Sequence, residues 1–225
     1  MTITTCVFDA YGTLFDITAA ARAAAAAPGG ERIADIWPVI AAEWRQRQLD
    51  QTWLRAAARR HADFERLTAD SLDDTLARHG IDDRALRDRM LGLFRRLPAF
   101  PEVPGVLDAL RARGLRLAVL SNGTPAMIGE AAEAAGIAGR LDSLLSVETA
   151  GVYKPHPNAY ALVEAHFGVH HAEVLFVSGN YWDAAGAAAF GFATVWVNRG
   201  GALRERMWAE PRHEVADLTG IGALL

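Results

Sequence analysis

The sequence has few of the features that mark a secreted or membrane protein. Its 225 residues include a single cysteine, Cys6, so no internal disulfide can form. Cys6 stands in an apolar run, so we interpret it as a small buried residue of a strand and not as a nucleophile. The first residues carry no positive charge and no apolar segment, and the run Ala19–Ala27 contains Arg22 and is too short to cross a bilayer. We therefore expect a cytoplasmic protein.

Blocks of like charge and metal-ligand patterns are also missing. The formal net charge is −4 and the 23 basic residues are spread along the chain, which gives no indication of a nucleic-acid or membrane partner. The seven histidines form no cluster with cysteine. We expect no metal site and no cofactor. Apolar residues make up 51% of the chain, which is enough for a sizeable core.

What the C-terminal half does have is an alternation of short apolar runs and helical patterns. The segments 116–123, 174–180 and 193–198 read as strands with polar ends, and 125–136 and 182–191 read as the helices that follow two of them. With Thr2–Phe8 as the first strand, this order predicts an α/β fold with a doubly wound, Rossmann-like parallel sheet.

The segment between the first strand and Pro101 has a different character. Residues 19–97 contain no strand pattern, but they contain a long helix over 37–60, with Pro38 near its start, and shorter amphipathic helices over 69–80 and 82–97. We therefore expect a core made of residues 1–16 and 99–225, and an all-helical domain over 17–98 inserted after the first strand.

Polar residues follow the predicted strands at the points where ligands bind in open α/β sheets. Singly, each has a plain explanation, because Asp at a strand end is often a turn former and Ser-Asn-Gly is often a simple turn. Together they place a carboxylate, a second carboxylate, a cation and several hydrogen-bonding groups at one edge, which favours a site. These residues are Asp9, Thr13, Ser121, Asn122, Lys154, Ser178, Asn180 and Asp183.

The first of these motifs, F-D-A-Y-G-T-L-F-D over 8–16, has Tyr11 where a second carboxylate could stand. The motifs D-A-Y-G-T, S-N-G, K-P and N-x-W-D, in this order and spacing, resemble the haloacid dehalogenase superfamily, and most of all its L-2-haloacid dehalogenase branch. The resemblance covers nearly the whole chain, including the helical insertion, which resembles the family's cap.

Tyr11 bears on the choice of reaction. Phosphatases of that superfamily carry D-x-D and use Mg²⁺, because a phosphate ester needs a general acid and a cation. A halide leaving group needs neither. The resemblance thus implies metal-independent hydrolysis of (S)-2-haloalkanoic acids to (R)-2-hydroxy acids, with Tyr11 as an apolar wall.

The resemblance also implies a role for each residue. Asp9 attacks the halogen-bearing carbon and forms an ester, and Lys154 keeps Asp9 ionised. Thr13 and Ser178 orient Asp9. Asp183 and Asn180 position the water that hydrolyses the ester, while Ser121 and main-chain N–H groups near Tyr11 bind the substrate carboxylate. The halide is held by Arg45, Asn122 and Trp182.

The remaining expected substrate contacts lie mainly on the long helix. Arg45, Gln46 and Leu49 share one helical face, since i+1 and i+4 lie about 100° and about 40° away. Without the resemblance, Arg45 would be read as one more solvated basic residue. Phe64 is expected to flank this face. Tyr160 matches a family residue near Lys154, but core packing explains it equally well.

Some alternatives stay open at this level. Family members commonly read Ser-Ser-Asn where this chain has Ser178-Gly179-Asn180, which affects the expected rate and substrate more than the reaction type. The same nucleophile could open another activated or strained carbon electrophile, such as a small ring amino acid. A Mg²⁺-dependent phosphatase and a non-catalytic small-acid binder are weaker alternatives. The resemblance suggests a homodimer.

Overall fold

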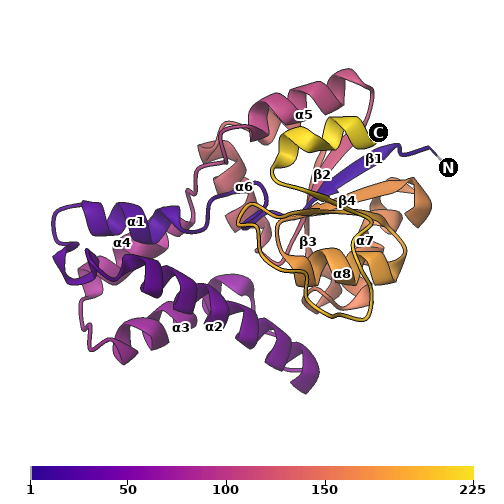
Figure 1. The fold of residues 1–225 in the computed structure, drawn as a ribbon. Coiled ribbons are helices and arrows are strands. Elements are labelled where there is room, and N and C mark those ends of the chain that lie inside the picture. Colours follow the sequence, from indigo (N-terminus) through magenta and orange to yellow (C-terminus); the bar gives the residue numbers. More distant parts are fainter. Residues whose placement is uncertain (1) are drawn as a thin grey trace.

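A six-stranded parallel sheet forms the centre of the protein in the computed structural model, which describes residues 2–225 (Figure 1). The strand order is β3-β2-β1-β4-β5-β6, so the chain winds outward from β1 in both directions and the predicted doubly wound sheet is confirmed. The strands are β1 (Thr5–Phe8), β2 (Arg116–Ser121), β3 (Ser143–Ser146), β4 (Val174–Ser178), β5 (Ala193–Val197) and β6 (His213–Val215).

The central strands differ from the edge strands in burial. β1 and β4 are buried along their whole length, which explains their continuous apolar runs. The edge strands β3 and β6 are short and mostly half-buried, and neither is among the strands predicted from the sequence. The first strand begins at Thr5 rather than at Thr2, so its expected start was also too early.

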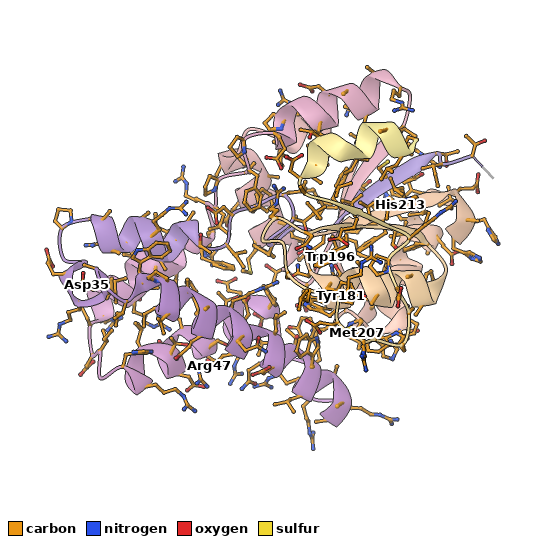
Figure 2. The ribbon with its side chains drawn as sticks, in the orientation of Figure 1. Asp35, Arg47, Tyr181, Trp196, Met207 and His213 are labelled. Atoms are coloured by element: carbon orange, nitrogen blue, oxygen red, sulfur yellow. The ribbon has the colours of Figure 1, made fainter. Side chains whose placement is uncertain are left out.

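Helices cover the two faces of the sheet (Figure 1). They are α5 (Val103–Ala112), α6 (Pro125–Ala134), α7 (Pro157–Phe167) and α8 (Tyr181–Phe190). Short 3-10 turns lie at η1 (Glu31–Ile33), η2 (Ala138–Arg140), η3 (Val147–Ala150), η4 (His171–Glu173) and η5 (Leu218–Leu224). A small separate cluster joins Tyr181, Ala184 and Trp196 with Met207 (Figure 2), and its two aromatic rings meet edge to face at 4.8 Å.

Four of the five α-helices between β1 and β2 stand to one side of the sheet (Figure 1). They are α1 (Ala19–Ala26), α2 (Trp37–Ala58), α3 (Phe64–Arg78) and α4 (Arg84–Phe94), and we call the segment Ala19–Phe94 the helical insertion. Pro38 lies in the first turn of α2, and α2 ends where Arg59 takes a left-handed φ of 55°. Asp63 and Asp83 cap α3 and α4 by accepting main-chain N–H groups.

The chain leaves the sheet region after Asp16, and the segment by which it returns, around Pro98, pairs with the segment by which it left. Asp16 N donates to the carbonyl of Pro98 at 3.0 Å, and Phe100 N donates to the carbonyl of Leu14 at 3.0 Å. The division into a core of 1–16 and 99–225 and a cap of 17–98 stays a prediction, and Met1 lies outside the described residues. Over residues 2–225, no helix is both long enough and apolar enough to span a membrane.

Candidate active site

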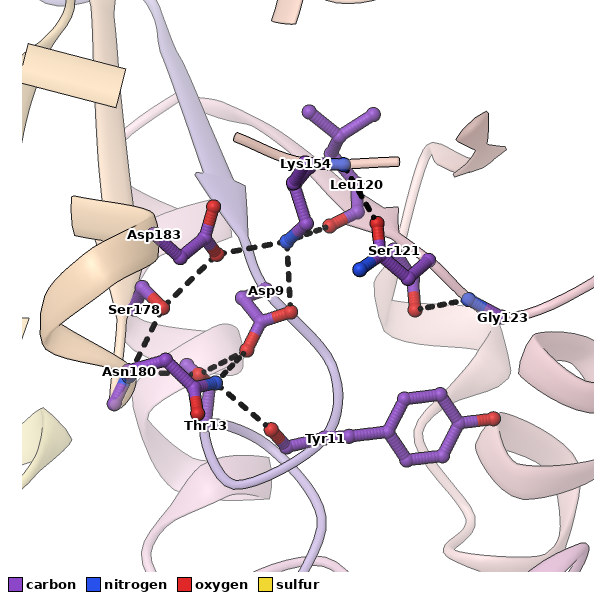
Figure 3. A network of polar contacts seen from close by, with 12 residues as sticks. Asp9, Tyr11, Thr13, Leu120, Ser121, Gly123, Lys154, Ser178, Asn180 and Asp183 are labelled. Atoms are coloured by element: carbon purple, nitrogen blue, oxygen red, sulfur yellow. Dashed lines mark hydrogen bonds and ion pairs between the residues drawn. The ribbon is translucent and has the colours of Figure 1, made fainter. Parts of the chain in front are cut away.

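The loops that follow β1, β2 and β4 meet at the carboxyl edge of the sheet (Figure 3). Asp9 directly follows β1, Ser121 ends β2, and Ser178 ends β4. Because β1 lies between β2 and β4, the side chain of Asp9 is placed at the centre of this edge. Lys154 reaches the same point from the loop before α7.

Asp9 accepts three hydrogen bonds, which together fix both oxygens of its carboxylate (Figure 3). Lys154 Nζ lies 2.8 Å from Oδ1, and Thr13 Oγ1 and Asn180 Nδ2 each donate to Oδ2 at 2.8 Å. The side chain is buried except for 5% of its surface. The three donors, one of which is the Lys154 ammonium, hold the carboxylate in one orientation.

Lys154 bridges two carboxylates. Its ammonium lies 2.7 Å from Asp183 Oδ2 and donates to the carbonyl of Leu120 at 3.0 Å, and it is 1% exposed. Burial by itself lowers the pKa of Lys154, but the charges and hydrogen bonds of Asp183 and Asp9 outweigh it, so the pKa lies above the ordinary lysine value. The lysine is therefore charged at neutral pH.

Asp183 is fully buried, and the contacts around it correct the expected partner of Ser178. Ser178 Oγ donates to Asp183 Oδ2 at 3.0 Å and not to Asp9, because it points toward the first turn of α8. Tyr160 donates to Asp183 Oδ1 at 2.8 Å, and its ring packs against Phe176 with no exposed surface. Tyr160 therefore supports Asp183 from behind and lines no substrate space.

Tyr11 connects the site to the helical insertion. Its main-chain carbonyl accepts from Asn180 at 3.0 Å, while its ring points away from Asp9 (Figure 3). The ring stacks on Phe94 at 5.3 Å and on Phe64 at 5.8 Å between centroids. Within the described chain its hydroxyl is buried and lacks a hydrogen-bond partner. Tyr11 is thus an apolar wall mainly toward α3 and α4.

Arg45, on α2, lies within the electrostatic influence of Asp9. Burial lowers its pKa, and the negative charge of Asp9 is the largest influence in the opposite direction. Leu49 is buried nearby on the same helix. Gln46 is exposed and donates to Asp50 at 2.8 Å, so the structure does not bring it to this group. Its place beside Arg45 is taken by Gln48, which the sequence analysis did not single out.

The remaining expected residues lie around the same edge. Ser121 Oγ accepts from Gly123 N at 3.0 Å, and Asn122 Oδ1 accepts from Lys154 N at 3.0 Å. Trp182 is half-buried and meets Trp53 of α2 edge to face at 5.5 Å. A cavity of about 340 Å³ opens beside Trp182, and its lining also includes Gly12, Leu49 and Asn180.

Gly179 has a local function that its sequence context did not reveal. Its N–H donates to Thr13 Oγ1 at 2.7 Å, and a Cβ at this position would lie 2.3 Å from the carbonyl oxygen of Gly12. The absence of a side chain thus allows the loop after β4 to approach the loop after β1. This approach places Thr13 and Asn180 on the same carboxylate oxygen of Asp9.

The sequence model of the haloacid dehalogenase-like hydrolases matches residues 3–191. The chain belongs to this family. It is 43% identical to the (S)-2-haloacid dehalogenase of Pseudomonas sp. (strain YL), a match that covers 95% of this chain and 90% of the relative. It is 40% identical to (S)-2-haloacid dehalogenase 1 of Pseudomonas sp. (strain CBS-3), over 99% of this chain and 96% of that one.

A solved structure of the family is also similar over almost the whole chain. It is the L-2-haloacid dehalogenase from Xanthobacter autotrophicus with chloropropionic acid covalently bound. The TM-score is 0.88 at 36% identity, covering 99% of this chain and 98% of the other. The resemblance seen in the sequence motifs is therefore confirmed at the level of the family.

Proposed function

We propose that the protein hydrolyses (S)-2-haloalkanoic acids to (R)-2-hydroxy acids through an ester on Asp9. The observation that carries the proposal is the Asp9 carboxylate itself, paired with the Lys154 ammonium and oriented by Thr13 and Asn180. A fixed, ionised carboxylate suits in-line attack on carbon. The named relatives act on (S)-2-haloacids, and one holds chloropropionic acid covalently, which supports the same reaction here.

The first step forms one bond and breaks one. An oxygen of Asp9 attacks C2 of the substrate, and the halide leaves with the electron pair of the carbon–halogen bond. Arg45, Asn122 and Trp182 hold the departing halide, and Ser121 with main-chain N–H groups near Tyr11 holds the substrate carboxylate. The proposed substrate contacts are completed by Gln46, Leu49 and Phe64. Because the Gln46 side chain is exposed, its contact requires α2 to move closer to the substrate.

The second step hydrolyses the ester and regenerates the free enzyme. Water attacks the carbonyl carbon of the Asp9 ester, the bond from that carbon to the alkoxy oxygen breaks, and the hydroxy acid leaves with an original Asp9 oxygen. One proton of the water passes to the alkoxy oxygen, and the other is released as Asp9 returns to a carboxylate. Asn180 and Asp183 are the proposed groups for the water. Because Asp183 already accepts from Lys154, Ser178 and Tyr160, its influence on the water passes through these partners.

A Mg²⁺-dependent phosphatase fits the arrangement less well. The ammonium of Lys154 lies between Asp9 and Asp183 at 2.8 and 2.7 Å, so a cation bound by both carboxylates would have to displace it. Tyr11 supplies no general acid. A non-catalytic binder would not need a buried lysine between two carboxylates. The opening of another activated or strained carbon electrophile by Asp9 uses the same groups and stays an alternative.

Two assays test the proposal. Halide release from (S)-2-chloropropionate should exceed hydrolysis of p-nitrophenyl phosphate with Mg²⁺, and it should persist in excess EDTA. In a single turnover in H₂¹⁸O with enzyme in excess, the product should carry ¹⁶O, and ¹⁸O should appear in the peptide containing Asp9. Label in the first product, with none in that peptide, would show direct attack by water instead.

We further propose that the protein is cytoplasmic and, on the family resemblance, that it works as a homodimer. Light scattering on the purified protein would distinguish one chain of 24.3 kDa from two. Fractionation of the producing cells would test the location.

A further inference from the structure

Gln48 is a buried polar residue that the proposed reaction does not use directly. It lies on α2, faces α3 and is 1% exposed. A buried amide needs partners for both its oxygen and its nitrogen. Arg45 Nη1 donates to Gln48 Oε1 at 2.8 Å, and Gln48 Nε2 donates to Thr68 Oγ1 of α3 at 2.7 Å.

Thr68 determines which end of the amide faces Arg45. Its hydroxyl donates to the carbonyl of Phe64 at 2.7 Å, which uses its single hydrogen. The oxygen of Thr68 is then left to accept, so it faces the amide nitrogen of Gln48. The amide oxygen consequently faces Arg45. A flipped amide would set its N–H group against the guanidinium, with donors on both sides.

The contact between the two helices is fixed independently of this chain of hydrogen bonds. Trp44 Nε1 donates to the carbonyl of Thr68 at 2.8 Å, and Trp44 is 3% exposed. α2 and α3 therefore meet at Thr68 at two points. The direction of the Arg45 side chain is tied through Gln48 to this junction.

A neutral acceptor suits an arginine that must act on another group. The oxygen of Gln48 orients Nη1 without neutralising the positive charge, whereas a carboxylate would form an ion pair with Arg45. The Nε–H of Arg45 is buried and has no partner among residues 2–225. The guanidinium is thus oriented at one nitrogen, while its charge is not neutralised and its Nε–H stays available.

We propose that Gln48, directed by Thr68, is a positioning residue that orients Arg45 toward the departing halide. The inference rests on the proposed function, because it needs Arg45 to act on the leaving group. It adds two residues, one on each of two helices, to the determinants of the reaction.

Variants of both residues test the proposal against matched controls. Gln48→Met and Thr68→Val remove the hydrogen bonds at similar volume. Gln51→Met, on the same helix, removes an acceptor for Arg55 instead, and Thr75→Val, on α3, removes a buried hydroxyl that likewise donates four residues back. Each variant is assayed with (S)-2-chloropropionate and (S)-2-bromopropionate.

We expect kcat for the chloride to fall about 10-fold in Gln48→Met and Thr68→Val, with a smaller loss for the bromide, because bromide needs less help to leave. KM should change less than about 2-fold. Thr68→Ser, which keeps the hydroxyl, should restore activity, and both controls should keep the wild-type ratio of the two rates. A loss that is equal for both halides would show a merely structural role and overturn the proposal.

A double-variant cycle separates this proposal from the proposed function. If Gln48 acts through Arg45, Gln48→Met should cost less than about 2-fold in the Arg45→Ala background. The same loss in both backgrounds would overturn the proposal. Arg45→Ala with normal kcat would refute the halide role of Arg45 and this inference with it, whereas an impaired Arg45→Ala beside an unimpaired Gln48→Met would refute only the positioning by Gln48.

Discussion

Lys154 is the residue on which the charge balance of the site depends. Among residues 2–225 it is the one cation that forms an ion pair with Asp9 and Asp183, and all three side chains are nearly or fully buried. Removal of one member of such a group leaves buried charge without a partner, which costs about 3–5 kcal/mol. The same contacts raise the pKa of Lys154 above its ordinary value.

A pH dependence of stability follows from that shift. Above the ordinary value of 10.5 the unfolded chain loses the proton of Lys154 while the folded chain keeps it, so the free energy of unfolding falls as the pH rises. We expect a steeper fall in the wild type than in Lys154→Arg, whose guanidinium stays charged. Urea unfolding between about pH 9 and about pH 11 measures both slopes. Parallel slopes would mean that Lys154 has no raised pKa.

Substitution of Tyr11 by phenylalanine should stabilise the protein. Its hydroxyl is buried without a partner in the described chain, and burial raises its pKa, with the charge of Arg45 acting the other way. An unsatisfied buried hydroxyl costs about 1–3 kcal/mol, so Tyr11→Phe should raise the free energy of unfolding by about 1 kcal/mol. Urea unfolding at neutral pH provides the measurement. A lower value for Tyr11→Phe would reveal a hydrogen bond to this hydroxyl.

Residues at strand ends were more predictable than those that act through helix packing. Asp9, Thr13 and Lys154 could be proposed because strand ends and a loop motif fix their place. The hydrogen-bond partner of Ser178 could not be predicted, since a side chain at the end of β4 can turn toward β1 or toward α8. Gln48 and Gln46 look alike in the sequence, and only the packing of α3 on α2 buries one and exposes the other.

At the scale of elements, the loop after β4 depends on Gly179. A Cβ there would lie 2.3 Å from the carbonyl oxygen of Gly12, whereas one at Gly129 of α6 would meet nothing within 4 Å. Gly179→Ser should therefore push the two loops apart, lower the free energy of unfolding by about 1–3 kcal/mol and lower kcat by weakening the bond from Gly179 N to Thr13.

Gly129→Ala is the control for that substitution. It lies in a helix interior with open space around it, so it should stabilise the protein slightly. Thermal unfolding and steady-state kinetics of the two variants provide the comparison. Normal stability in Gly179→Ser would show that the loops have room for the serine that family members commonly carry there.

The elements themselves were predictable to different degrees. β1 and β4 carry continuous apolar runs because both of their faces are covered, and such runs are recognisable in a sequence. β3 and β6 have four and three residues and lie at the edges, so their patterns are too short to recognise. α3 begins five residues before the expected helix, at Phe64, because Asp63 provides its cap.

At the scale of the whole molecule, the proposed reaction needs the helical insertion to be correctly placed on the sheet region. Arg45 comes from the insertion, and Asp9 comes from the sheet region. Glu148 of η3 makes a contact across this boundary. Its carboxylate lies 2.8 Å from His61 Nε2 and accepts from Phe64 N at 3.2 Å, and the nearby Tyr153 hydroxyl donates to the carbonyl of Ala62. The contact therefore fixes the start of α3, whose Phe64 stacks on Tyr11.

Loss of this carboxylate should affect turnover through the placement of the insertion. The pair of Glu148 with His61 is partly exposed and contributes below about 1 kcal/mol, and the bond from Phe64 N adds about 1 kcal/mol. Glu148→Ala should therefore lower kcat/KM by about 5- to 30-fold, while Glu148→Gln, which keeps the acceptor for Phe64 N, should lose less. Steady-state kinetics beside urea unfolding separates placement from stability. If both variants lose stability but keep kcat/KM, then the aromatic stack on Tyr11 and the paired chain segments at Asp16 and Pro98 suffice to hold the insertion in place.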